Sequence, residues 1–159
     1  MPACVSDIPL GSILPARIAR RSPVPIAQAN GVALHVELLG TMPPAIKIDK
    51  ARIRQALQNL LDNALRHTPD SGQVTIAVQQ IVSHLQIQVS DNGEGIAADQ
   101  LPLVFDRLYR GDIARQRQGG STGLGLAISK ALVEAHGGTL TADSPGIGQG
   151  STFTISFTL

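Results

Sequence analysis

The sequence has few of the residues that mark several common classes of protein. It has one cysteine, Cys4, so no disulfide can form within the chain, and a reducing compartment such as the cytoplasm is expected. Its net charge is only +1 and aromatic residues make up 3%, with no stripe of lysine and arginine interleaved with aromatics, so no nucleic-acid interface is predicted. No apolar run approaches the roughly 18 residues of a membrane span, and no charged-then-apolar signal segment opens the chain. We therefore expect a soluble piece of a longer protein, without direct membrane contact.

The composition is nevertheless that of a folded domain. At 159 residues, with 43% hydrophobic and 16% charged residues, the chain can bury a core of its own. Residues 31–159 show no internal linker and are predicted to form one domain. Residues 1–30 contain helical spacing interrupted by prolines, which break or kink a helix. They are predicted to be a kinked helix packed on the domain, or the remnant of a linker.

Strands are predicted where apolar and polar residues alternate. These stretches are residues 31–40, 73–79, 84–91, 138–144 and 151–159. Several of them follow one another as hairpins instead of alternating strictly with helices. This order predicts an α/β (α+β) two-layer fold with a mixed sheet.

Two helices are predicted from apolar residues at helical spacing. The first has Asp49 as its N-cap and Pro69 as its stop. Its apolar face comprises Ile53, Leu57, Leu60, Leu61, Ala64 and Leu65. The second is predicted to begin at Thr122, or just before it, and to be closed by Gly137 and Gly138.

Asn59, Asn63 and Arg66 are spaced to lie on one face of the first helix, opposite the leucines. A solvated polar face is the simplest interpretation, although asparagine is a mediocre helix former. The functional interpretation is a shelf for a metal and a phosphate. An amide oxygen is a hard ligand suited to Mg²⁺, and an arginine one turn further can pair with the phosphate.

The segment GGSTGLGLAIS (119–129) places glycines at the start of the second helix. Helix capping by Ser121 or Thr122 is one interpretation. Two glycines inside the first turn would each weaken a helix by about 1 kcal/mol relative to alanine, which favours a ligand-related reason. A phosphate could approach the bare N–H groups and the positive end of the helix dipole. The Gly-Lys-Ser/Thr ending of a P-loop is missing, and GIGQGS (146–151) is predicted to be a hairpin turn, not a dinucleotide-binding loop.

A third segment, SDNGEGI (90–96), follows a predicted strand. It is either a glycine turn that ends the strand, or a site where Asp91 recognises a ligand that the glycines allow to come close.

Four segments resemble the N, G1, F and G2 boxes of sensor histidine kinases, in the order and at the separations of that family. They are QNLLDNALRHTP (58–69), DNGEGI (91–96), LPLVFDRLYRGD (101–112) and GGSTGLGLAISKALVEAHGG (119–138). The resemblance covers roughly residues 31–159. It implies the Bergerat fold of GHKL-type ATPases, with a mixed, mostly antiparallel sheet layered on helices. ATP would bind between the helices under a flexible lid between Ala97 and Thr122.

The resemblance implies a nucleotide site and two cofactors, ATP and Mg²⁺. The nucleotide-binding residues would be Asn59, Asn63, Arg66, His67, Asp91, Gly93, Gly95, Ile96, Thr122, Gly123, Leu124, Gly125, Leu126 and Thr152. Asn63 would hold Mg²⁺, with Asn59 beside it. Asp91 would accept the adenine amino proton. The catalytic residues would be Asn59 together with Arg107 and Arg110 of the F box, whose side chains would face the γ-phosphate when the lid closes.

The remaining members of this set would surround the base and the phosphates. Gly93 and Gly95 would let the base lie against the backbone, Ile96 would line its pocket, and Thr152 would touch the adenine, through water. Arg66 would contact a phosphate and His67 the adenine or ribose. The N–H groups of Gly123, Leu124 and Gly125 would be offered to the phosphates.

The sequence departs from related families at two points. The gyrase, Hsp90 and MutL types carry a glutamate general base where this chain has Asn59, and an amide cannot accept the proton of an attacking water. Slow hydrolysis is therefore expected. The acceptor histidine of sensor kinases is followed by an acidic residue, which is true of none of the four histidines here. His35 and His84 are predicted strand residues, and His136 a partner of the helix dipole.

The resemblance thus implies the ATP-binding catalytic domain of a two-component sensor kinase. Its partners would be ATP, the dimerising phosphoacceptor domain of the same kinase and a response regulator. Two alternatives stay open: a hydrolysing ATPase of the same fold, and a nucleotide-binding module without turnover of its own.

Overall fold

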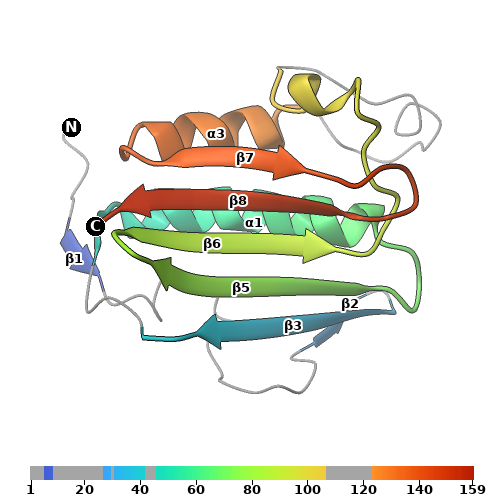
Figure 1. Ribbon diagram of the computed structural model, residues 1–159, viewed down its shortest axis with the longest axis horizontal. Helices are drawn as coiled ribbons and strands as arrows, with labels where there is room; N and C mark the ends of the chain where they lie inside the picture. Colours follow the sequence, from blue (N-terminus) through green and yellow to red (C-terminus); the bar gives the residue numbers. More distant parts are fainter. Residues whose placement is uncertain (1–5, 9–26, 30, 42–45, 107–122) are drawn as a thin grey trace.

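The computed structural model describes residues 6–8, 27–29, 31–41, 46–106 and 123–159 (Figure 1). Its elements in chain order are β1 (Ser6–Ile8), β2 (Ala27–Ala29), β3 (Val32–Leu39), β4 (Ile46–Ile48), α1 (Lys50–His67), β5 (Gln73–Ile81), β6 (His84–Asp91), the 3-10 turn η2 (Leu101–Leu103), α3 (Gly125–Glu134), β7 (Thr139–Asp143) and β8 (Ser151–Thr158). Among these residues, no helix is both long and apolar enough to cross a membrane.

A six-stranded sheet forms one layer, in the order β2-β3-β5-β6-β8-β7. Only β3 and β5 pair in parallel, and this pairing requires the crossover that contains α1. The other neighbours are antiparallel, including the β5–β6 and β7–β8 hairpins. The predicted mixed, mostly antiparallel sheet is confirmed.

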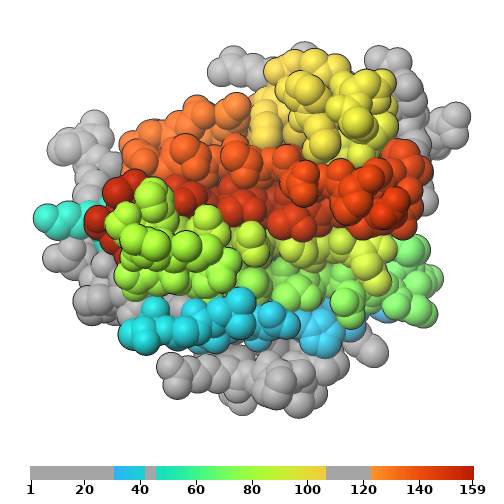
Figure 2. Space-filling model, viewed as in Figure 1, coloured from blue at the N-terminus to red at the C-terminus, as the bar shows by residue number. Residues whose placement is uncertain are grey.

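The two helices form the second layer, on one face of the sheet (Figure 1). The alternation seen in the sequence places every second residue of β5, β6 and β8 against them, so that Val89 and Phe153 are fully buried. The apolar face of α1 is buried with them, except that Leu65 is only half-buried. Figure 2 shows the other face of the sheet, where β3, β5, β6, β8 and β7 lie side by side with no helix over them.

The predicted ends of α1 are confirmed. The carboxylate of Asp49 accepts hydrogen bonds from the backbone N–H groups of Ala51 (2.9 Å) and Arg52 (3.1 Å), as an N-cap does. The helix ends at His67, and Thr68 is its C-cap, immediately before Pro69. The predicted closure of α3 is also confirmed, because the N–H of Gly138 donates to the carbonyl of Val133 (3.1 Å).

The prediction that the second helix begins at Thr122 or before it is wrong. Gly123 has φ +65°, a left-handed conformation that a right-handed helix does not use, and Leu124 is the N-cap of α3. Only Gly125 is therefore inside the first turn. The destabilisation of the helix that was expected from two glycines comes from one. Thr122 itself lies outside the described residues.

The first thirty residues also differ from the prediction where they are described. Residues 6–8 and 27–29 are strands and not parts of a kinked helix. β1 pairs with β4, which the sequence analysis did not predict, and β2 extends the main sheet along the start of β3. The division of the chain at residue 31 stays a prediction.

Candidate nucleotide-binding site

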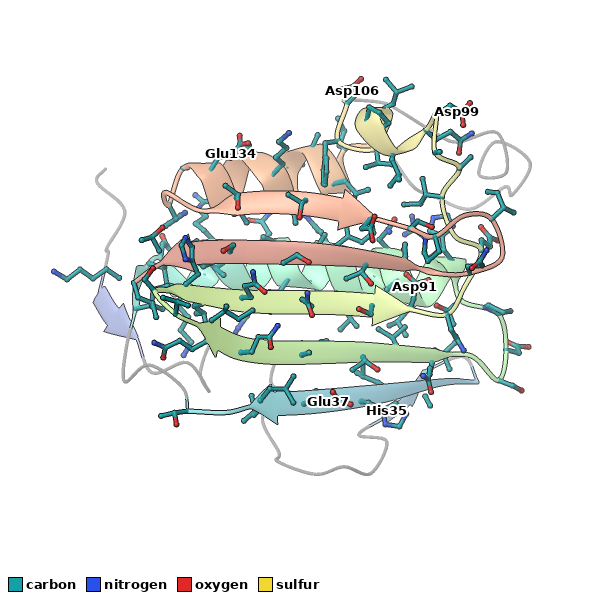
Figure 3. The ribbon with its side chains drawn as sticks, in the orientation of Figure 1. His35, Glu37, Asp91, Asp99, Asp106 and Glu134 are labelled. Atoms are coloured by element: carbon teal, nitrogen blue, oxygen red, sulfur yellow. The ribbon has the colours of Figure 1, made fainter. Side chains whose placement is uncertain are left out.

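Three segments from different regions of the sequence meet at one end of the sheet. There β6 ends beside the start of β8, and the end of α1 lies behind them in the view of Figures 1 and 3. Asp91 is the last residue of β6, and its register partner in β8 is Ser151. The glycine turn, defined as residues 91–96, begins here. The start of α3 also contacts α1, through a hydrogen bond between Asn59 and Gly125.

The carboxylate of Asp91 is held at both oxygens. Oδ1 accepts a hydrogen bond from the N–H of Gly93 (2.9 Å), and Oδ2 accepts one from the hydroxyl of Ser151 (2.6 Å). The residue is half-buried, so one side of it is open. Because an ionised carboxylate has about four acceptor positions, it can accept a further hydrogen bond from a ligand such as an amino group. This geometry suits the binding role predicted for Asp91.

Ser151 is a site residue that the sequence analysis missed. It predicted Thr152, but successive residues of a strand point to opposite faces of the sheet. Thr152 shares its face with Ser90, and their hydroxyls lie 2.9 Å apart on the face without helices. The structure therefore does not bring Thr152 to Asp91. The parity of Ser151 with the buried residues of β8 was the signal that could have identified it.

Packing within the protein explains why this turn contains glycines. A Cβ added at Gly93 would collide with the carbonyl oxygen of His67. Gly95 has φ +69°, and a Cβ there would collide with the carbonyl oxygen of Gly146. Close packing of backbone on backbone thus explains both glycines without a ligand. Their predicted role in admitting a base stays a prediction.

The glycine turn is bound on two sides by hydrogen bonds. The N–H of Glu94 donates to the carbonyl of His67 (3.0 Å), which joins the turn to the end of α1. On the other side, the N–H of Gly148 donates to the carbonyl of Glu94 (2.7 Å), and the N–H of Ile96 donates to the hydroxyl of Ser144 (2.9 Å). The β7–β8 connection, which was correctly predicted to be a hairpin turn, thereby supports the site.

His67 closes α1 beside this turn. Its Nδ1 lies 3.0 Å from Oε2 of Glu94, and both side chains are partly exposed. This contact fixes the ring next to the glycine turn. A contact of His67 with the adenine or ribose is compatible with this position and stays a prediction.

The amide of Asn59 does not lie on a solvated polar face, which was the simpler of the two interpretations of this row. Its Nδ2 donates to the carbonyl of Gly125 (3.2 Å) and to the hydroxyl of Ser129 (3.3 Å), both in α3. Asn63, one turn further, is half-buried, and Arg66 is exposed. The predicted polar row of α1 therefore runs from a contact with α3 out to solvent.

The start of α3 has features that suit a phosphate site. Its N-cap is Leu124, whose side chain makes no capping hydrogen bond, and the first N–H groups of a helix have no partner within it. Among the described residues, and apart from the backbone of α3 itself, a Cβ added at Gly125 would meet only the side chain of Asn59, at 3.9 Å. The neighbouring Leu126 and the Ile96 side chain on the turn are partly buried against the core.

The residues of the site fit a Mg²⁺ ion whose remaining ligands would be phosphate oxygens. The described residues contain no cluster of three histidine, cysteine or acidic side chains that could hold a metal alone. Mg²⁺ needs only one or two protein oxygens when phosphates supply the others. The amides of Asn59 and Asn63 lie one turn apart on α1, and Asn59 contacts the start of α3. They are the residues that would hold it.

The F box is described only in part. Arg107 and Arg110 lie outside the described residues, as does most of the predicted lid. Phe105 of the same box, two residues before Arg107, packs edge-on against Phe153 of the core, with ring centroids 6.2 Å apart. The ammonium group of Lys130 in α3 lies 5.1 Å from the centre of the Phe105 ring. These contacts anchor the beginning of the F box beside α3.

Comparisons with known proteins agree with this geometry. Residues 48–159 match the family described as "Histidine kinase-, DNA gyrase B-, and HSP90-like ATPase". The chain is 45% identical over 130 residues to the sensor histidine kinase WalK of Bacillus subtilis, covering 79% of this chain and 21% of WalK. It is 50% identical over 105 residues to the probable sensor histidine kinase TcrY of Mycobacterium tuberculosis, covering 65% and 22%. The chain thus spans about a fifth of the length of these relatives.

Solved structures share the fold. The mycobacterial sensor histidine kinase MprB superposes with a TM-score of 0.68 at 30% identity, over 80% of this chain and 82% of that one. Full-length ShkA in complex with AMPPNP superposes with a TM-score of 0.78 at 25% identity, over 98% of this chain and 31% of ShkA.

Proposed function

The chain belongs to the histidine kinase-, DNA gyrase B- and HSP90-like ATPase family, as the ATP-binding catalytic domain of a sensor histidine kinase, and on this premise we propose its reaction. It transfers the γ-phosphoryl group of ATP to a histidine of a separate dimerisation domain. The products are ADP and a phosphohistidine, which then serves a response regulator. The domain acts in the cytoplasm, where both partners are found.

One observation carries the proposal. The Asn59 amide in α1 donates to the carbonyl of Gly125 in α3, across 66 residues of sequence. This hydrogen bond supports the proposal because it joins the polar row of α1 to the glycine-rich start of α3. Either segment alone is compatible with a purely structural role. Together they put the Asn59 amide beside the start of α3, where the first N–H groups have no acceptor within the helix, and this supports a site for a metal–phosphate group.

Different residues of the site bind different parts of the nucleotide. Asp91 accepts a hydrogen bond from the adenine amino group, with its carboxylate held by Gly93 and Ser151. The N–H groups at the start of α3 bind the phosphates, and Arg66 pairs with them from the exposed end of α1. Asn63 holds Mg²⁺, with Asn59 beside it. Bound Mg²⁺ would neutralise charge that develops on the phosphates during transfer.

Transfer to a protein is favoured over hydrolysis because Asn59 is an amide. A hydrolysing ATPase needs a base that takes a proton from water, and an amide cannot accept one. The base, if the reaction uses one, comes from the acceptor domain. The four histidines are poor acceptors in their positions: two are strand residues, His67 contacts Glu94, and Nδ1 of His136 lies 2.7 Å from the carbonyl oxygen of Leu132.

The test is incubation of this chain with γ-labelled ATP and Mg²⁺, with and without a separately produced phosphoacceptor hairpin. We expect acid-labile label on the hairpin and little free phosphate in its absence. Sustained phosphate release without the hairpin would favour the hydrolysing ATPase. Nucleotide binding without any labelled hairpin would favour a binding module that lacks turnover.

A further inference from the structure

We propose that Ser129 of α3 is a positioning residue that sets the orientation of the Asn59 amide. This inference rests on the proposed function, because it concerns how Asn59 presents its oxygen to the metal–phosphate group. Ser129 itself does not reach the nucleotide. It acts on the site through Asn59 and through the first residue of α3, Gly125.

The orientation of the Asn59 amide follows from its partners. A backbone carbonyl can only accept a hydrogen bond, so the end of the amide that lies 3.2 Å from the Gly125 oxygen must be the nitrogen. The same nitrogen lies 3.3 Å from the Ser129 hydroxyl. The two acceptors lie 2.9 Å apart, so one N–H of the amide points between them and the nitrogen end of the amide faces α3. The oxygen, on the other side of the amide, is left as the group that can face a ligand.

Ser129 is fixed in this role by its surroundings. It is 0% exposed, one of three polar residues that are buried in the described part of the chain. Its hydroxyl lies 2.9 Å from the Gly125 carbonyl oxygen and 3.2 Å from that of Ala56 in α1. Because the hydroxyl proton goes to one of these carbonyls, a lone pair of the oxygen is available to accept from Asn59. The hydroxyl thus turns towards Asn59 as an acceptor.

This arrangement links two parts of the site. Gly125 belongs to the helix start whose N–H groups bind phosphate in the proposed function, and its carbonyl holds the Asn59 nitrogen. Ser129 bonds to that same carbonyl one turn later. A displacement of the helix start by a bound phosphate is therefore passed to the Asn59 amide. A serine that only joined two helices would have no such effect on metal-dependent binding.

The test measures ADP affinity by calorimetry, with and without Mg²⁺, and the rate of phosphoryl transfer. We expect Ser129→Ala to reduce the gain in affinity that Mg²⁺ produces by about fivefold, the effect of one lost neutral hydrogen bond, and the transfer rate by at least as much. Affinity for ADP without Mg²⁺ should stay within about twofold of that of the unmodified chain. Ser129→Thr keeps the hydroxyl and should restore the Mg²⁺ effect.

Two controls separate positioning from stability. Asp49→Ala removes the N-cap at the far end of α1, destabilises the helix by about 1 kcal/mol and should leave the Mg²⁺ effect unchanged. In an Asn59→Ala background, Ser129→Ala should cause no further loss, because the amide that it positions is gone.

Each contrary result identifies which idea fails. An unchanged Mg²⁺ effect in Ser129→Ala, an additive loss in the Asn59→Ala background, or an equal loss in Asp49→Ala would overturn the positioning role. These outcomes leave the proposed function intact provided that the unmodified chain binds ADP and phosphorylates the hairpin. If the unmodified chain binds no ADP, the proposed function itself fails, and the inference fails with it.

Discussion

The two glycine-containing segments of the site differ in what surrounds them. In the glycine turn, the space that a side chain would need at Gly93 and Gly95 is already filled by backbone atoms of α1 and of the β7–β8 connection. At the start of α3, no described residue fills the corresponding space beside Gly125, and the nearest of them is Asn59 at 3.9 Å. Packing of the described residues therefore requires glycine in the first segment and not in the second, where the reason that we propose is a ligand. The same residue type in two motifs of one family has two different physical reasons.

The largest effect is expected for Gly95→Ala. The substitution places a Cβ against the Gly146 carbonyl and requires φ +69° from an L-residue. We expect a loss of unfolding free energy on the order of 3 kcal/mol or more, measured by urea denaturation. Gly137→Ala, where φ is +72° and no described atom lies within 4 Å of an added Cβ, tests the contribution of conformation alone. A stable Gly95→Ala variant that no longer bound nucleotide would reverse the comparison.

The next largest effect is expected for Asp91→Asn, which keeps the shape of the side chain but removes its charge and one acceptor. We expect ADP affinity to fall on the order of 100-fold, because an amide NH₂ would face the adenine amino group. The domain should stay folded, since the substituted side chain still has an oxygen for the Gly93 N–H. Calorimetry and circular dichroism measure the two quantities. An unchanged ADP affinity would exclude adenine recognition by Asp91.

Gly125→Ala tests the open side of the comparison. We expect equal or higher stability, by up to about 1 kcal/mol, because alanine is the better helix former and its Cβ meets no close atom. We also expect nucleotide affinity to fall about tenfold as the methyl group occupies space beside Asn59. Thermal unfolding and calorimetry on the same preparation check both. A variant with lower stability and unchanged affinity would mean that this glycine, too, serves packing.

The smallest effect is expected for Ser151→Ala, and Thr152→Val is its matched control. Loss of the Ser151 hydroxyl removes one hydrogen bond to Asp91, and we expect ADP affinity to fall about fivefold. Thr152 lies on the opposite face of the sheet, so its substitution should change affinity by less than about twofold. If the two effects were reversed, the adenine would be contacted from the Thr152 side.

The sequence analysis succeeded where the cause of a structure is local. Alternating residues predicted β3, β5 and β6, and the carboxylate of Asp49 and the ring of Pro69 marked the ends of α1. Three-residue strands such as β4 carry too few residues for a pattern, and they form because a partner strand pairs with them. The start of α3 was misplaced because the left-handed conformation of Gly123 cannot be read from its identity.

The candidate site was predicted as a set of residues and not as a geometry. The roles of Asn59 and Asp91 came from their motifs, but the partners that orient them, Ser129 and Ser151, lie 70 and 60 residues away in sequence. Contacts of that separation depend on how α1 packs against α3 and on the register of β6 with β8. No spacing rule within one motif contains that information.

The register that sets Asp91 opposite Ser151 also bears on the order in which the chain folds. β5 and β6 are joined by a two-residue turn and can pair early, because their contacts close short loops. β6 can pair with β8 only after a much longer segment has been brought back, so the carboxylate–hydroxyl contact is made late. We therefore expect substitutions at Ser151 to accelerate unfolding while leaving the folding rate nearly unchanged. The nucleotide site would then be the last part of the domain to form and the first to open.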